Sequence, residues 1–390
     1  MKKHPIHGLN PITKKGWRHH ASFLWTLLCL IQMLAVLQAA SKEHAIARPG
    51  YQFEYPRDFG SHPEFKIEWW YITGHLRSED QKRFGYQATF FRLASDAETS
   101  NENKKGAPPD LHLAHMALLD LENRTFYHQE RLQRSPWMAY AKQKDMDLKN
   151  GNWKLRRIKG TTPEFELNGS ILADISLNLK FTARKPITLF GDKGYSRKGS
   201  DPMAASYYMT FTRLQTKGEL RIKGKSFQVQ GWSWMDHEIS SSQLTENQVG
   251  WDWVSMRLND GRDLMAYRMR TTEGKADPFS TIAWVDESGN ASHQRLKDDT
   301  WQVLRLWTSP ETKNTYPVEV KLTLPDPNGD AAFHAHIVPL FDAQEMLGHI
   351  SGIEYWEGAC DVLDSSGNRI GEAYMELAGY GGESDLNAIK

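Results

Sequence analysis

One short segment combines a carboxylate with three large aromatic side chains. Within residues 62–76, Glu68 is followed directly by Trp69, Trp70 and Tyr71. Because side chains alternate along a strand, Glu68 should share a face with Trp70, and the other two aromatic residues should point the opposite way. Burying a carboxylate costs free energy unless it is paired or hydrogen-bonded. Glu68 is therefore expected to be either a paired structural acid or an acid that lines an aromatic cavity.

A second segment, residues 231–238, ends in Asp236, His237 and Glu238. Adjacent acidic and histidine groups at a strand end are candidates for general acid–base catalysis, because their surroundings can separate their pKa values. Asp236 could instead bind the N–H groups of a turn, and His237 could be a solvated or hydrogen-bonded histidine. Since neighbouring residues of a strand point to opposite faces, the cluster offers no spaced set of ligands, and we predict no metal site.

These residues must be positioned mainly by strands. Short runs rich in aromatic and β-branched residues recur along the chain, and glycine-containing turns such as Asn259-Asp260-Gly261, Lys223-Gly224-Lys225 and Ser288-Gly289-Asn290 separate several of them. Many short strands joined by such turns indicate a β-sandwich or a β-barrel. Helical periodicity is scarce, so the sequence predicts an all-β protein.

The two halves of the chain are weakly similar to each other. A shift of 182 residues places Trp69 on Trp251 and Tyr71 on Trp253. Each of these segments then crosses a polar turn into a second aromatic strand. Two halves of this length suit two barrels, and the division should fall near residues 215–230.

The first 40 residues have the composition of a targeting segment. They contain five basic residues and no acidic one, and an apolar run extends from about 21 to 40. This pattern predicts a signal peptide, and an uncleaved membrane anchor is the alternative. Removing the segment leaves 43 basic against 48 acidic residues, a net charge of −5, which argues against nucleic acid as a partner. No later apolar run approaches bilayer length, so the mature part should not span a membrane.

Other patterns narrow the possible chemistry. Arg268 and Arg270 share one face of the strand that follows the Asn-Asp-Gly turn. They should either face solvent on the outside of the sheet or pair with Glu68 or Asp236. No nucleophile elbow, phosphate-binding glycine loop or zinc-protease motif occurs in the sequence, so a serine hydrolase of the usual kind is not supported.

Several segments of the sequence resemble the motifs of a known family. Residues 55–76 (YPRDFGSHPEFKIEWWYITGHL) resemble the opening motif of AttH-like proteins, which belong with the carotenoid 1,2-hydratases (hydroxyneurosporene synthases). The segments Gly231–Glu238, Gly250–Trp253, Tyr355–Gly358 and Gly379–Tyr380 fit the same pattern in the same order. The resemblance extends over nearly all of residues 51–382.

The resemblance implies two consecutive lipocalin-like antiparallel β-barrels, at residues 48–225 and 226–385, and export to the periplasm or the exterior. For the hydratase branch it also implies addition of water to a terminal isoprenoid double bond, without a cofactor. Other members of the family are linked to ABC exporters. A non-catalytic lipid carrier, or an accessory protein of an export system, is therefore the alternative to a hydratase or isomerase.

Acid-catalysed hydration would require a proton donor in an apolar site and shelter for a carbocation. A carboxyl group beside indole rings has a raised pKa and can remain protonated, and aromatic faces stabilise a cation. Asp236 is the favoured proton donor, His237 would handle the water, and Glu68 is the other candidate acid. The candidate residues for binding a hydrophobic, isoprenoid or lipid-like ligand are Trp69, Trp70, Tyr71, Trp234, Trp251, Trp253, Arg268, Tyr355 and Trp356.

Overall fold

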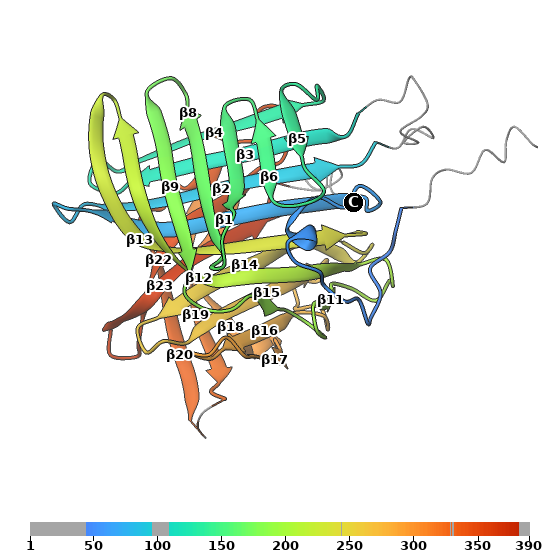
Figure 1. Ribbon diagram of the computed structural model, residues 1–390. Helices are drawn as coiled ribbons and strands as arrows, with labels where there is room; N and C mark the ends of the chain where they lie inside the picture. Colours follow the sequence, from blue (N-terminus) through green and yellow to red (C-terminus); the bar gives the residue numbers. More distant parts are fainter. Residues whose placement is uncertain (1–43, 96–108, 243, 328, 330, 382–390) are drawn as a thin grey trace, which may run out of the picture. The chain divides into compact units, whose positions relative to one another are not determined.

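Two large antiparallel sheets contain nearly all of the regular structure (Figure 1). The computed structural model describes residues 44–95, 109–242, 244–327, 329 and 331–381. Within these residues the helical segments are two three-residue 3-10 helices, η1 (Arg57–Phe59) and η2 (Asp298–Thr300). The all-β prediction is therefore confirmed. The predicted leader, residues 1–40, lies outside the described part of the chain, in which no helix is long and apolar enough to cross a bilayer.

The first sheet has thirteen strands, and its main path runs β4-β3-β2-β1-β13-β12-β9-β8-β7-β6-β5, with β10 and β11 paired to β12. These strands are β1 (Ile67–Ser78), β2 (Arg83–Leu93), β3 (Leu111–Asp120), β4 (Thr125–Gln133), β5 (Ala139–Ala141), β6 (Asp147–Asn150), β7 (Trp153–Ile158), β8 (Glu164–Ile171), β9 (Ile175–Ala183), β10 (Thr188–Leu189), β11 (Tyr195–Arg197), β12 (Ala205–Ile222) and β13 (Lys225–Ser240).

The first sheet curls until the two ends of its path approach each other. The side-chain amide of Asn150 on β6 donates hydrogen bonds to the carbonyl oxygens of His112 on β3 and Arg131 on β4. The sheet is thus nearly closed into a barrel, and its inner face encloses an apolar core that includes Trp70, Phe165 and Phe181. Burial of this core is the main source of stability for a chain with a single cysteine among the described residues.

The second sheet has ten strands, in the order β17-β16-β15-β14-β23-β22-β20-β19-β18, with β21 paired to β22. These strands are β14 (Gln248–Leu258), β15 (Asp263–Thr271), β16 (Thr281–Val285), β17 (Ala291–Arg295), β18 (Trp301–Thr308), β19 (Thr315–Pro325), β20 (Ala332–Pro339), β21 (Glu345–Met346), β22 (Tyr355–Leu363) and β23 (Arg369–Ala378). Its inner face encloses a separate core around Trp284, Tyr316 and Trp356.

The predicted turns join neighbouring strands as their residues suggest. Lys223 and Gly224 connect β12 to β13 with φ values of 47° and 81°, the positive values that a two-residue turn requires at both central positions. Gly261, with a φ of 95°, lies between β14 and β15, and Gly289, with a φ of 90°, lies between β16 and β17. All three predicted hairpins are confirmed.

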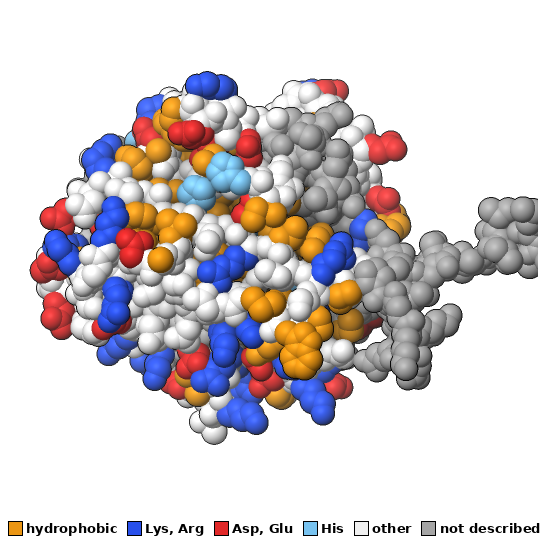
Figure 2. Space-filling model, turned by 90° about the horizontal axis from the view of Figure 1, so that it is seen from above, with side chains coloured by type: hydrophobic (Ala, Val, Ile, Leu, Met, Phe, Trp, Pro, Cys, Tyr) orange, Lys and Arg blue, Asp and Glu red, His pale blue; other side chains and the backbone are white. Residues whose placement is uncertain are grey.

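The outer face of the first sheet packs against the second sheet. Tyr71 and Tyr208 of the first sheet share one apolar cluster with Trp253 and Tyr267 of the second. The approach is close at Gly85 on β2, where an added Cβ would lie 2.5 Å from the Cβ of Ala359 on β22. On the surface that Figure 2 shows, by contrast, basic and acidic side chains are interspersed with apolar ones.

The change from the first sheet to the second occurs between Ser240 and Gln248. The boundary expected at 225/226 falls at the first residues of β13, directly after the β12–β13 turn, and β13 belongs to the first sheet. The described residues cluster into one compact unit. That each of the ranges 48–225 and 226–385 forms a domain of its own stays a prediction.

Candidate functional site

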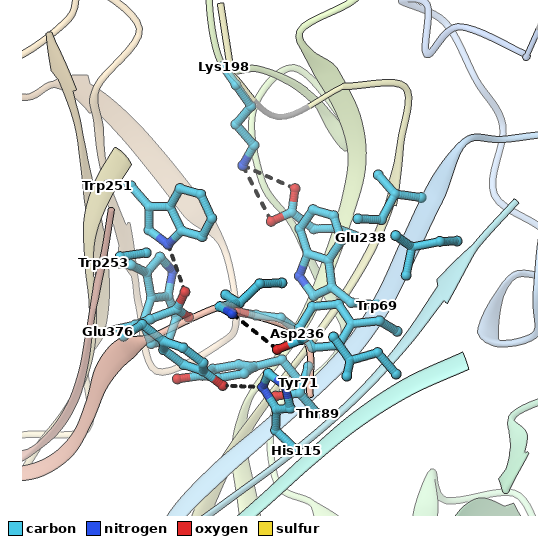
Figure 3. A pocket seen from close by; sticks show the side chains of 18 of the residues that line it. Trp69, Tyr71, Thr89, His115, Lys198, Asp236, Glu238, Trp251, Trp253 and Glu376 are labelled. Atoms are coloured by element: carbon cyan, nitrogen blue, oxygen red, sulfur yellow. Dashed lines mark hydrogen bonds and ion pairs between the residues drawn. The ribbon is translucent and has the colours of Figure 1, made fainter. Parts of the chain in front are cut away.

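A cavity of about 210 Å³ lies between the two sheets (Figure 3). Its walls come from β1, β2, β3, β4, β12 and β13 of the first sheet and from β14, β15, β22 and β23 of the second. Lys198 and the segment 350–353 complete the lining. Most of the lining is aromatic or aliphatic, and the polar groups are few. The cavity therefore suits an apolar ligand that is oriented by a few polar contacts.

Strand register decides which predicted residues reach this cavity. In the antiparallel pair of β1 and β13, Tyr71 lies opposite Asp236 and Trp69 lies opposite Glu238. Residues directly opposite each other point to the same face of a sheet, so all four line the cavity. Glu68 points to the other face. The predicted separation of Glu68 and Trp70 from Trp69 and Tyr71 is confirmed.

Asp236 is the most buried acid of the cavity, with 3% of its surface exposed. Its carboxyl group accepts hydrogen bonds from the hydroxyl groups of Tyr208 (2.8 Å) and Thr210 (2.5 Å) and from the indole N–H of Trp234 (2.8 Å). Burial, reinforced by the nearby Glu238, raises the pKa of Asp236 to about 7, although these hydrogen bonds oppose the shift. Asp236 can therefore carry a proton near neutral pH and release it to a bound molecule.

Glu376 on β23 is a second acid of the cavity, and the sequence analysis missed it. It lies opposite Trp253 in the ladder of β14 and β23, and it accepts a 2.8 Å hydrogen bond from the indole N–H of Trp251. Burial, together with Asp236 and Glu238, raises the pKa of Glu376 to about 7. The alternation of Glu372, Tyr374 and Glu376 before the Gly379-Tyr380 motif is the sequence signal that could have found it.

A buried ion pair occupies another side of the cavity. The Lys198 ammonium lies 3.1 Å from Glu238 and 4.5 Å from the ring centroids of both Tyr208 and Tyr267. Burial alone would lower the pKa of Lys198, but Glu238 raises it above its ordinary value. Lys198 therefore remains charged, and Glu238 neutralises it.

Across the cavity, Tyr355 forms a hydrogen-bonded pair with a histidine from the first sheet. His115 Nδ1 and the Tyr355 hydroxyl are 2.7 Å apart, and the Gln87 amide donates to the same hydroxyl at 3.3 Å. Burial lowers the pKa of His115 to about 3, so this imidazole is neutral. The pair holds Tyr355 in place by contacts between the sheets.

A loop between β21 and β22 closes one side of the cavity. Ile350, Ser351 and Ile353 of this loop line the cavity. The carboxylate of Glu130 on β4 accepts hydrogen bonds from the backbone N–H groups of Ile350 and Ser351 and, at 2.8 Å, from the Ser351 hydroxyl. The first sheet therefore anchors a loop of the second.

Glu68 lies on the opposite face of β1, in a hydrogen-bonded network that does not reach the cavity. One carboxylate oxygen contacts His62 Nδ1 at 2.9 Å and His237 Nε2 at 3.0 Å. The other accepts from the Ser61 hydroxyl at 3.0 Å and from Arg92 Nε at 3.2 Å. Burial would raise the pKa of Glu68, but the two imidazoles and Arg92 hold it well below its ordinary value. Glu68 is therefore a paired structural acid, which is the first of the two alternatives that the sequence predicts for it.

The same network contains a group that could hold a metal ion. The donor atoms of His62, Glu68 and His237 all lie within 4.8 Å of one another. These donors are already engaged with each other, and the guanidinium of Arg92 adds positive charge next to the shared carboxylate. A cation there would be repelled by Arg92, so these residues fit a network of hydrogen bonds and ion pairs better than a metal site.

The other candidate ligand-binding residues are divided between the cavity and the two cores. Trp251, Trp253 and Tyr355 line the cavity, as do Trp69 and Tyr71. Trp234 lies behind the cavity wall and donates to Asp236.

Three of these candidates, Trp70, Arg268 and Trp356, do not line the cavity, because strand alternation turns them to the inner faces of the sheets. Trp70 is buried in the first core and stacks on His237 at 4.5 Å. Trp356 is buried in the second core, where its indole N–H donates to the Asp342 carbonyl oxygen at 2.7 Å.

Arg268 pairs with Asp252 at 3.3 Å, neither with Glu68 nor with Asp236. His237 lies with Glu68, on the face opposite the adjacent Asp236. The adjacency of Asp236 and His237 in sequence therefore does not bring their functional groups into one site.

Comparison with known proteins identifies the family and the fold of this chain. A family model described as AttH-like matches residues 46–380. An AttH protein from Nitrosomonas europaea has a similar solved structure, with 34% identity and a TM-score of 0.74, covering 86% of this chain and 99% of that one. Kievitone hydratase from Nectria haematococca is similar in fold, with 12% identity and a TM-score of 0.63, covering 86% and 96% of the two chains.

The structure of CghA with Sch210972 is also similar in fold, with 12% identity and a TM-score of 0.50, covering 88% of this chain and 98% of that one. No curated protein matches the sequence. The family match spans both sheets and the cavity between them, and the Nitrosomonas structure is matched over almost its whole length. This chain, with its lipocalin-like fold, belongs to the AttH-like family.

Proposed function

We propose that this protein binds a hydrophobic, isoprenoid or lipid-like molecule between its sheets and hydrates or isomerises a carbon–carbon double bond by acid catalysis. The observation that carries the proposal is Asp236, a carboxyl group in an aromatic cavity with a pKa of about 7. An ordinary aspartate would be ionised at neutral pH and could not donate a proton. General acids are effective when their pKa lies near the working pH.

In the proposed reaction, Asp236 transfers its proton to the less substituted carbon of the double bond. The positive charge then resides on the tertiary carbon, which faces the rings of Trp251 and Trp253. Each aromatic face stabilises such a cation by about 0.5–2 kcal/mol.

Glu376 completes the reaction. Water adds its oxygen to the tertiary carbon, and the carboxylate of Glu376 takes the proton that this water loses. A proton then returns from Glu376 to Asp236, which restores both groups. In an isomerisation, Glu376 would instead remove a proton from a carbon next to the cation. Both acids have a pKa of about 7, so a proton can pass from either one to the other without a large cost in free energy.

The reaction class has support from a similar fold. Kievitone hydratase, by its name, is a hydratase, and its fold covers most of this chain. The finer expectation of a carotenoid-type substrate rests on the resemblance in sequence alone. The basic and apolar leader leads us to propose that the protein acts outside the cytoplasm, which cell fractionation with N-terminal sequencing of the native protein would test.

The test uses the chain from residue 41 to 390. Lipids that co-purify are identified by mass spectrometry, and terminal isoprenoid alkenes are incubated with the protein in ¹⁸O-labelled water. We expect ¹⁸O in an alcohol product, and we expect Asp236→Asn to reduce its rate at least about 100-fold. The exposed Asp299→Asn is the matched control and should behave as the wild type.

Equal rates for Asp236→Asn and the wild type would refute acid catalysis by this residue. A lipid that is retained but never altered would favour a non-catalytic carrier. This alternative function would also fit an accessory protein of an export system. Both outcomes are read from the same mass spectra, so they can be told apart in one experiment.

A further inference from the structure

The cavity already holds one ammonium group, that of Lys198. This group has a carboxylate at 3.1 Å, from Glu238, and the faces of Tyr208 and Tyr267 at 4.5 Å. A carboxylate combined with aromatic faces is the usual environment of a bound organic cation. Lys198 thus shows, within the same cavity, how a positive charge is accommodated without bulk water.

The same combination recurs on the other side of the cavity without a lysine or arginine. Asp236 and Glu376 lie among the rings of Tyr71, Trp251 and Trp253 (Figure 3). Among the described residues, neither acid forms an ion pair with a basic side chain, and Lys198 is paired with Glu238. The cavity therefore has three carboxyl groups and one ammonium group to balance them.

We propose that the cavity binds hydrophobic cations, with the positive group of the ligand held between Asp236 and Glu376 and against the rings of Trp251 and Trp253. The inference rests on the proposed function, because it concerns the same cavity. It goes further by naming the ligand class that the site should prefer: an alkylammonium ion whose apolar tail follows the aliphatic wall. For a reaction through a carbocation, such an ion resembles the transition state more than the neutral substrate does.

The charge of the ligand and the ionisation of the two acids are coupled. Both acids have a pKa of about 7, so at pH 5.5 they are mostly protonated and offer a cation little attraction. A bound cation favours their ionised forms and lowers both pKa values. For each unit by which the bound cation lowers the pKa of one acid, binding at a pH above 7 is about tenfold tighter than binding to the protonated acid. Affinity for a permanent cation should therefore rise from pH 5.5 to pH 8.

The experiment compares three probes with the same eight-carbon tail: octyltrimethylammonium, octanol and octanoate. Binding to residues 41–390 is measured by calorimetry and by tryptophan fluorescence. At pH 8 we expect octyltrimethylammonium to bind at least about tenfold more tightly than octanol, and octanoate to bind most weakly. At pH 5.5 the preference for the ammonium over octanol should fall about tenfold, while octanol binding stays constant.

Two variants assign the effect to the proposed residues. Asp236→Asn and Glu376→Gln should each weaken octyltrimethylammonium binding about tenfold at pH 8 and leave octanol binding unchanged. The exposed Glu311→Gln is the matched control for the second variant and should retain the wild-type preference. Octanol binding reports that each variant has kept its cavity, so a loss of folding cannot be mistaken for a loss of charge recognition.

Equal affinity for the ammonium and octanol at pH 8, or an unchanged preference in both variants, would overturn the inference. Alkene turnover, measured separately, distinguishes this failure from failure of the proposed function. Turnover that depends on Asp236, with no preference for the cation, overturns the inference alone. A preference that depends on both acids, with no turnover of any alkene, supports the inference and removes the proposed reaction.

Discussion

Replacement of Asp236 by asparagine should make the protein more stable at alkaline pH. In the folded protein the pKa of Asp236 is raised from 3.8 to about 7, mainly by burial. A raised carboxyl pKa means that the folded state binds the proton more tightly than the unfolded chain does. The resulting stability is present below the ordinary pKa and is lost as the pH rises from about 4 to about 7. Asparagine has a similar shape and cannot ionise, so the variant does not lose this stability as the pH rises.

The size of the effect follows from the shift. Roughly three pKa units at about 1.4 kcal/mol per unit correspond to about 4 kcal/mol once both states are ionised. Between pH 5 and pH 8, the free energy of unfolding of the wild type should fall by about 3 kcal/mol relative to Asp236→Asn. The Asp236 carboxylate also helps to raise the pKa of Glu376, so Asp236→Asn should weaken the pH dependence that Glu376 contributes, which adds to the difference in the same direction.

Urea unfolding of both proteins at pH 5, 6, 7 and 8 measures this difference directly. Asp299→Asn makes the same chemical change on the surface and should show no comparable dependence on pH. A difference between Asp236→Asn and the wild type that stays constant from pH 5 to pH 8 would mean that Asp236 ionises like an exposed aspartate. That result would remove the physical basis of its role as a proton donor.

Three further predictions concern contacts outside the acid pair. Glu68→Gln should lower the free energy of unfolding by about 3–5 kcal/mol at pH 7, because the network loses its central carboxylate and the buried Arg92 keeps only its ion pair with the partly exposed Asp110; urea unfolding measures this. Tyr71→Phe removes the 2.6 Å hydrogen bond from its hydroxyl to Glu357 between the sheets, and it should cost about 1–3 kcal/mol in the same assay. Glu130→Gln should release the loop over the cavity, and the loop amides should exchange with deuterium about tenfold faster, with global stability little changed.

Each of these predictions has an outcome that contradicts it. A Glu68→Gln variant as stable as the wild type would mean that the network around it is not a paired structural site. If Tyr71→Phe is as stable as the wild type, the hydrogen bond from the Tyr71 hydroxyl to Glu357 contributes no more than the hydrogen bond to water that this hydroxyl forms in the unfolded chain. Unchanged exchange in the loop after Glu130→Gln would show that its own packing, and not the carboxylate, holds it over the cavity.

Local patterns in the sequence were sufficient for the strand content, the turns and the faces of β1. Lys223-Gly224, for example, can occupy the positive-φ positions of a hairpin whatever surrounds it. Alternation likewise separates Glu68 from Tyr71 without knowledge of the fold. The family motifs identified the family, which the comparisons then showed.

The composition of the cavity could not be predicted in this way, because its partners are distant in the chain. His115 meets Tyr355 across 240 positions, and Trp251 meets Glu376 across 125. Arg268 was open to several partners, and only packing assigned it to Asp252. The place of such a residue depends on how two sheets face each other, which no short segment encodes.

The sequence by itself determined that a carboxylate, two indoles and a phenol would alternate along one strand, because side-chain direction in a strand is a local property. It also marked Asp236 as a candidate acid. Only the tertiary structure decided that Asp236 faces a cavity while Glu68 is paired, and it alone added Glu376. The physical reason is that a carboxyl pKa depends on desolvation and on neighbouring charges, and here both arise where two distant parts of the chain pack together.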